Sequence, residues 1–143
     1  MEAKAYLMQY LELKADIECK KAENEQWLYL AGGITPPTLN ERVQSSGNDH
    51  RSEDAIIRYM RKVEENEAAI ERCKEKMAEI LSVIAKLDNA TLRKILLLYY
   101  TEGKQLDEIA AEIKYSYPYT KDLHGVALQK IQKIINSLPN PLE

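Results

Sequence analysis

The clearest hydrophobic pattern lies in residues 52–87, where inward-facing positions recur every three or four residues without a slip. This spacing predicts a long helix with a narrow seam that winds around another helix. Ser52 is expected as its N-cap, with Glu53 and Asp54 in the first turn, where acidic side chains complement the helix dipole. The seam positions are Ile56, Tyr59, Val63, Asn66, Ile70, Cys73, Met77, Ile80, Ile84 and Leu87.

A second long helix is predicted for residues 3–31, and Gly32 and Gly33 end it. We expect it to fold back on the 52–87 helix, so that residues 1–87 form an antiparallel helical hairpin. The alternative is self-association, with the heptad seam pairing between subunits of a homo-oligomer. The inward positions of this helix are Tyr6, Tyr10, Leu13, Ile17, Lys20, Asn24, Trp27 and Ala31.

The expected hairpin register places Trp27 near Val63 and Tyr6 near Ile84. Asn24 then lies close to Asn66. These two asparagines either form a buried polar pair that fixes the register, or they are solvated at the edge of the seam.

Residues 32–51 are expected to form a long connecting loop. Pro36-Pro37 cannot continue a helix, and the stretch 45–49 is rich in turn-forming residues. A loop of this length inside a compact domain is either functional or a plain connector.

Residues 88–137 predict three shorter helices, so the fold class is all-α, with a tail at 138–143. Asp88 or Asn89 caps the first, a bend at 101–103 ends it, the second lies near 105–113, and the third starts after Ser116. Two helices joined by a turn of about three or four residues are typical of a helix-turn-helix. The expected inward positions are Leu92, Ile95, Leu96, Tyr99, Leu106, Ile109, Ala110, Ile113, Thr120, Leu123, Ala127, Leu128, Ile131 and Ile135.

The start of the third helix is the expected DNA-binding surface, because the second helix of a helix-turn-helix enters the major groove. Lys121 could donate to guanine or to a phosphate, and Asp122 could accept from cytosine N4. Tyr115, in the turn, is either partly buried or part of this surface. The candidate DNA-binding residues are Ser116, Tyr117, Pro118, Tyr119, Lys121 and Asp122.

The segment LDEIAAEIKYS…LHGVAL resembles the fourth region of bacterial sigma factors, whose helix-turn-helix reads the −35 promoter element. The matching features are Glu108-Ile109-Ala110, Ser116 and Ala127-Leu128. This sequence departs from the sigma pattern at the start of the third helix, where sigma factors usually carry several Arg or Lys.

The whole chain also resembles small sigma-like regulators from phages and prophages of Gram-positive bacteria. That resemblance rests on the long N-terminal helix, on the 34–36 and 42–46 segments of the loop, on Tyr115-Ser116 and on 123–125. It implies DNA-binding transcriptional regulation.

Composition and charge modify this picture. The net charge is −3, and residues 88–143 carry seven Lys/Arg against seven Asp/Glu. A free-standing DNA-binding domain is usually basic. The neutral unit therefore favours weak autonomous binding to double-stranded DNA, assisted by a partner such as RNA polymerase.

Chemistry other than binding is not indicated. Cys19 and Cys73 are expected as reduced, packed residues, and His124 as a packed residue. The cysteines and histidines lack the short spacings of a zinc site, and no catalytic or phosphate-loop motif appears. We therefore expect no enzyme, no metal and no cofactor. The absence of a signal peptide or a membrane-spanning run predicts a cytoplasmic protein without a membrane partner. The resemblance to phage and prophage regulators implies that the cell is a bacterial host.

Three functions remain open from the sequence. The first is a phage or prophage transcription regulator. The second is a DNA-packaging adaptor similar to small terminase subunits, which also combine a helix-turn-helix with coiled-coil oligomerisation. The third is a protein-binding module that inhibits a host transcription factor.

Overall fold

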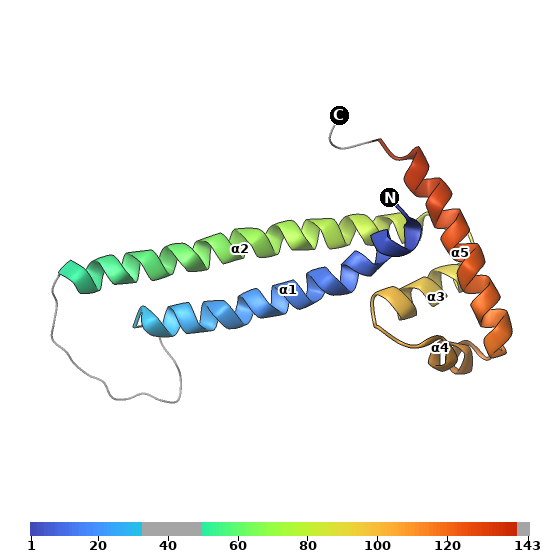
Figure 1. The fold of residues 1–143 in the computed structure, drawn as a ribbon, viewed down its shortest axis with the longest axis horizontal. Helices are drawn as coiled ribbons and strands as arrows, with labels where there is room; N and C mark the ends of the chain where they lie inside the picture. The colour runs from blue at the N-terminus through green and yellow to red at the C-terminus, as the bar shows by residue number, and fades with distance from the viewer. Residues whose placement is uncertain (33–49, 140–143) are drawn as a thin grey trace. The chain divides into compact units, whose positions relative to one another are not determined.

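The computed structural model describes residues 1–32 and 50–139, without the side chains of 50–52. Within these residues the chain forms five α-helices and no strand (Figure 1). The all-α class expected from the sequence is confirmed. The helices are α1 (Ala3–Leu30), α2 (His50–Ala85), α3 (Ala90–Tyr100), α4 (Leu106–Ile113) and α5 (Tyr117–Ser137).

The helix boundaries lie close to the expected ones, with one correction at the start of α2. This helix begins at His50, so Ser52 lies inside it and the N-cap prediction for Ser52 is wrong. At the other end, the amides of Lys86 and Leu87 donate to the carbonyls of Val83 and Ile84 at 3.1 Å and close a final tighter turn. Most of the expected 32–51 loop, with its 34–36 and 42–46 segments, lies outside the described residues.

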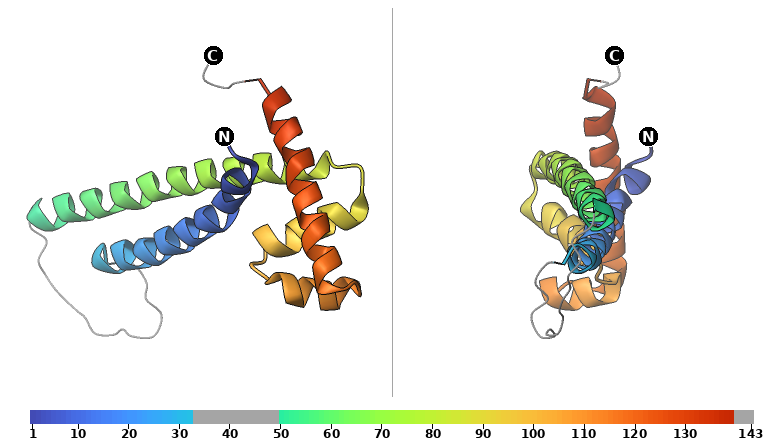
Figure 2. Two further views of the ribbon diagram at one scale, coloured as in Figure 1. Left: turned by 45° about the vertical axis from the view of Figure 1, so that its right-hand side comes forward. Right: turned by 90° about the vertical axis from the view of Figure 1, so that its left-hand side faces the viewer.

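The chain divides into two compact units. The two-helix unit (Ala15–Cys73) holds the second half of α1 and the first part of α2. The core unit (Met1–Lys14 with Lys74–Glu143) holds the start of α1, the end of α2, and α3 to α5. Within each unit the segments of α1 and α2 run antiparallel (Figures 1 and 2).

In the two-helix unit, the seam positions that the pattern predicted are buried or partly buried, except for Ile56. Ile17, Val63 and Ile70 are all less than a tenth exposed. The rings of Trp27 and Tyr59 stack with centroids 5.7 Å apart. Ile56 is 42% exposed, so its predicted burial is wrong. The reason is that it lies beyond Tyr59, which already contacts Trp27 near the end of α1.

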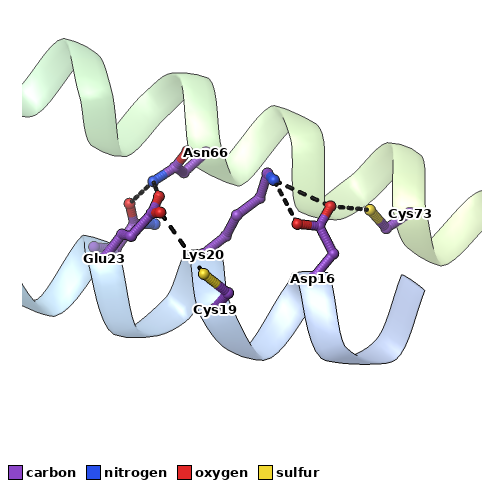
Figure 3. Close-up of polar contacts among 7 residues, drawn as sticks. Asp16, Cys19, Lys20, Glu23, Asn66 and Cys73 are labelled. Carbon is purple, nitrogen blue, oxygen red and sulfur yellow. Dashed lines mark hydrogen bonds and ion pairs between the residues drawn. The ribbon is translucent and has the colours of Figure 1, made fainter. Parts of the chain in front are cut away.

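Two polar layers interrupt this seam (Figure 3). In the first, Asn66 Nδ2 donates to Asn24 Oδ1 at 2.9 Å and to Glu23 Oε1 at 3.2 Å. Asn24 is only 9% exposed. The two asparagines therefore form a hydrogen-bonded pair in which Asn24 is buried and Asn66 is partly buried.

In the second layer, Lys20 Nζ donates to both oxygens of Asp16, at 2.9 and 3.1 Å, and the Cys73 thiol lies 3.7 Å from Asp16 Oδ2 (Figure 3). The bond from Lys20 lowers the pKa of Asp16. Burial, followed by the Asp16 charge, raises the pKa of the Cys73 thiol. Cys73 is buried as expected. Cys19 is exposed, and its predicted packing is wrong, because it faces away from the seam toward Glu23.

The largest buried cluster belongs to the core unit and draws on four helices. Its members are Ala3, Tyr6 and Leu7 of α1; Ile80, Val83 and Ile84 of α2, with Leu87 after it; Leu92, Leu96 and Tyr100 of α3; and Ala127 and Ile131 of α5. The start of α1 and the end of α2 therefore share one core with the C-terminal helices. The boundary at 87/88, drawn from sequence, runs through this core.

Polar contacts join the N-terminal residues to α5 and α2 within the core unit. The amide of Ala3 donates to Gln132 Oε1 at 2.7 Å, and Gln132 Nε2 donates to the carbonyl of Met1 at 3.0 Å. Tyr6 donates to Glu79 Oε2 at 3.2 Å, and burial together with the Glu79 charge raises the pKa of Tyr6 to about 12.

None of the helices in the described segments has both the length and the apolar character needed to cross a bilayer.

Candidate nucleic-acid interface

The candidate interface is built where α4 turns into α5. α4 ends at Ile113, and Lys114 adopts the left-handed conformation with φ 65°. The amide of Tyr115 then donates to the carbonyl of Ala110 at 3.1 Å, which satisfies a carbonyl at the end of α4. The chain thereby changes direction within the residues 114–116 that the sequence predicted as a turn.

Ser116 is the N-cap of α5, so its role is structural as well as being a candidate contact. Its hydroxyl accepts from the amide of Tyr119 at 3.2 Å, and its carbonyl accepts from the amide of Thr120 at 2.9 Å. Pro118 lies in the first turn, where a missing amide hydrogen costs nothing. These features fix the direction in which α5 leaves the turn.

Thr120 anchors the first turn of α5 to the core unit. It is completely buried, and its hydroxyl donates to the carbonyl of Ser116 at 2.9 Å. Further along α5, Leu123 packs against the cluster of Ile95, Leu98 and Ile109, so this face of α5 is held on α3 and α4. The inward face of α5 is thus the one that the sequence predicted.

The opposite face of this turn is exposed at every candidate residue: Ser116, Tyr117, Pro118, Tyr119, Lys121 and Asp122. Tyr117 and Tyr119 are 48% and 51% exposed. Tyr115, whose burial the sequence left open, is 43% exposed, and its ring meets that of Tyr119 edge to face at 5.2 Å. The structure therefore leaves every predicted residue exposed around the start of α5, and Tyr115 joins them through its contact with Tyr119. We call this set, with Tyr115, the α5 surface.

Two features next to the α5 surface were missed by the sequence reasoning. Gln105 and Glu108 form a capping box at the start of α4, in which the amide of Gln105 donates to Glu108 Oε1 at 2.8 Å. Lys104 donates to Glu112 at 2.8 Å and lies 3.7 Å from Glu102. The bond to Glu112 raises the pKa of Lys104 and lowers that of Glu112. The position of Glu108 three residues after Gln105, which is the spacing of a capping box, is the one signal that the sequence offered.

The pairing of Lys104 has a consequence for charge. Because Lys104 lies beside two carboxylates, its positive charge is already offset locally. The exposed cations nearest the turn in sequence are Lys114 and Lys121, while Asp107 and Glu108 occupy the first turn of α4. The electrostatic attraction between the region around the α4–α5 turn and a DNA phosphate backbone is therefore weak.

His124 lies behind the α5 surface as a packed residue, as expected. Its Nε2 is 2.9 Å from the Tyr100 hydroxyl, and its ring stacks on Tyr100 at 5.7 Å and contacts Tyr99 at 5.0 Å. Burial, followed by the charge of Lys4, lowers the pKa of His124. Burial also raises the pKa of Tyr100. Both side chains are thus held neutral at neutral pH, and they bind α5 to α3.

A recess opens beside Tyr117, lined also by Tyr99, Gln105, Leu106 and Asp107. It contains one carboxylate and no histidine or cysteine. Across the described segments, no cluster of three or more His, Cys, Asp or Glu side chains suited to a metal ion is found.

Comparison with known proteins returned no matching protein family, no matching curated protein and no matching solved structure.

Proposed function

We propose that this protein is a DNA-binding transcriptional regulator of the sigma-like kind, and that the first turn of α5 enters the major groove of promoter DNA. One observation carries the proposal. Thr120 is fully buried while its neighbours Tyr117, Tyr119 and Lys121 are exposed, so a rigid, capped helix start presents its side chains outward. A recognition helix contacts base edges with the residues of its N-terminal turn.

The chemistry of the α5 surface suits a mixed readout. Lys121 can donate to guanine O6 or N7 or to a phosphate, and Asp122 can accept from cytosine N4. The exposed tyrosines can meet thymine methyl groups with their rings and phosphates with their hydroxyls. Pro118 contributes shape only.

The weak positive charge favours assisted binding. Phosphate contacts by Lys and Arg supply most of the affinity of a DNA-binding protein. Lys104 is held by Glu112 and Glu102, and residues 88–143 are neutral overall. We therefore propose that RNA polymerase holds the protein at the promoter, and that the protein works in the cytoplasm of a bacterium carrying a phage or prophage.

The test is titration of the full chain onto DNA spanning its own gene neighbourhood, at low salt, with and without core RNA polymerase. Lys121→Glu should weaken binding by about tenfold or more, since one lost base or phosphate contact costs about 1–3 kcal/mol. Lys130→Glu is the matched control, because it changes the same charge at an exposed position later on α5. Equal effects of the two variants, or no binding in any condition, would overturn the proposal.

A second function is favoured by one specific observation, the exposure of three tyrosines. Tyrosines are enriched at protein interfaces, and Tyr115 and Tyr119 already contact each other on the α5 surface. The second candidate is a protein-binding module that inhibits a host transcription factor. It predicts that a Tyr117→Ala, Tyr119→Ala double variant loses binding to a sigma or polymerase subunit, while Lys121→Glu retains it and DNA does not compete.

A further inference from the structure

The two-helix unit carries an exposed apolar patch that neither its seam nor the α5 surface explains. The patch lies on the early turns of α2. Its side chains are between 38% and 56% exposed. The residues of this apolar patch, which lie on adjoining sides of the helix, are Ile56, Ile57 and Met60.

Position along the helix separates the patch from the seam. Tyr59 and Val63 face α1, and of the patch residues on α2 only Ile56 continues that seam. Ile57 lies two residues before Tyr59, so it projects from a different side of α2. Large apolar side chains gathered on an exposed surface mark an interaction site far more often than isolated ones do.

Charge on the same side of α2 indicates the partner. Asp54 lies three residues before Ile57, and Arg61 lies four residues after it, so the three share one side of the helix. Asp54 and Arg61 are both exposed. If two copies of α2 cross antiparallel at Ile57, Asp54 of each copy meets Arg61 of the other, whereas a parallel pairing would place like charges together.

We propose that the apolar patch is a dimer interface, in which α2 of one copy packs antiparallel on α2 of a second copy around Ile57. A two-fold axis at Ile57 makes the contact self-complementary, as a closed dimer requires. The apolar residues form the centre, and the two Asp54–Arg61 pairs form the rim. The seam is occupied by the chain's own α1, so the dimer uses a different face from the seam.

The dimer is independent of the proposed function, but it would reinforce it. Two linked DNA-binding units gain effective concentration for the second contact without any new contact to DNA. Weak, nearly neutral binding units benefit most from this effect.

The first experiment is sedimentation equilibrium of the full chain over a range of concentrations. We expect a monomer–dimer equilibrium, and Met60→Lys should raise the dimer dissociation constant by about tenfold or more, which corresponds to about 1.4 kcal/mol. Leu81→Lys is the matched control, because Leu81 is also on α2 and is 38% exposed, as Met60 is. A wild-type chain that stays monomeric, or equal loss of the dimer in both variants, would overturn the proposal.

A charge exchange tests the antiparallel arrangement itself. Asp54→Arg and Arg61→Asp should each weaken the dimer, because each places like charges opposite each other twice. The double variant should restore the dimer, because the pairs are reformed with exchanged signs. Additive weakening in the double variant would refute the arrangement. Circular dichroism of each variant shows whether the helices remain folded.

Discussion

At the scale of single residues, His124 shows how the core unit handles a titratable group. Its ring contacts those of Tyr99 and Tyr100, and its Nε2 shares a hydrogen bond of 2.9 Å with the Tyr100 hydroxyl. Burial is the main reason why its pKa is lowered, with the charge of Lys4 second. Neutral His124 thus stabilises the core unit, whereas protonation of its ring lowers the free energy of unfolding.

The effect of protonating His124 predicts that the stability of the protein depends on pH. The folded-state pKa of His124 lies below its unfolded value of about 6.5, so the unfolded chain takes up its proton first as the pH falls. The contribution of His124 is complete above about pH 6.5 and is lost as the pH falls through the folded pKa. His124→Gln should therefore flatten the decline of the free energy of unfolding on the acid side.

The measurement is urea unfolding of the wild type and of His124→Gln at a series of pH values. The difference between the two proteins removes the contribution of the carboxylates, which also lose stability in acid. Each unit by which the pKa of His124 is lowered corresponds to about 1.4 kcal/mol. If the difference in free energy of unfolding between the two proteins is the same at pH 7 and in acid, the assignment is contradicted.

At the scale of helices, the asparagine pair in the seam between α1 and α2 is the most specific contact. Asn24 is nearly completely buried and accepts from Asn66 at 2.9 Å. In Asn66→Leu, Asn24 loses its bond from Asn66, and a buried unsatisfied polar group costs about 1–3 kcal/mol. The double variant Asn24→Leu, Asn66→Leu removes both polar groups and should recover this loss or exceed the wild type.

A double-mutant cycle by thermal or urea unfolding measures the coupling. Two residues in direct contact usually couple by about 0.5–3 kcal/mol. If the effects of the two single variants simply add, the hydrogen bond contributes nothing measurable. In that case the pair does not set the register of α1 on α2.

The seam also shows what the sequence can and cannot predict. The three–four spacing predicted burial at Ile17, Val63, Ile70 and Ile80, because periodicity follows directly from helix geometry. It failed at Ile56, because exposure there depends on where the partner helix ends. The packing expected for Cys19 rested on its residue type rather than on the spacing, and it is wrong because helix phase places the thiol outward.

The candidate site was predictable to a similar degree. The inward phase of Thr120 and Ala127 follows from spacing, and this phase decides which neighbours are exposed. The Lys104–Glu112 pair was not predictable, because it depends on how the bend near Gly103 brings two segments together. Sequence therefore indicated which residues form the α5 surface, whereas its charge needed the structure.

At the scale of the whole molecule, the core unit is made from both ends of the chain. Leu7, Ile80 and Ile84 are almost fully buried in the same cluster as Leu96 and Ile131. A fragment that begins at residue 88 would expose its side of this cluster to water. The C-terminal helices thus depend on the first residues of α1 and the last turns of α2.

The same arrangement predicts that the two-helix unit is dispensable for folding of the core unit. Cys73 Sγ lies 3.7 Å from Asp16 Oδ2, so α1 and α2 are in side-chain contact next to the points where the two-helix unit begins and ends. We expect a chain in which a short turn joins Lys14 to Lys74 to fold, because its core cluster is complete. A fragment of residues 88–143 should be far less stable, since it lacks seven of the twelve buried members of that cluster.

Circular dichroism and thermal unfolding distinguish these two shortened chains. If the fragment of residues 88–143 unfolds as cooperatively as the joined chain, the contribution of α1 and α2 to the core is not needed. The joined chain also separates the two proposals made above. It keeps the α5 surface and lacks the apolar patch, so it should be monomeric and should still bind DNA, with a lower apparent affinity because the second binding unit is lost.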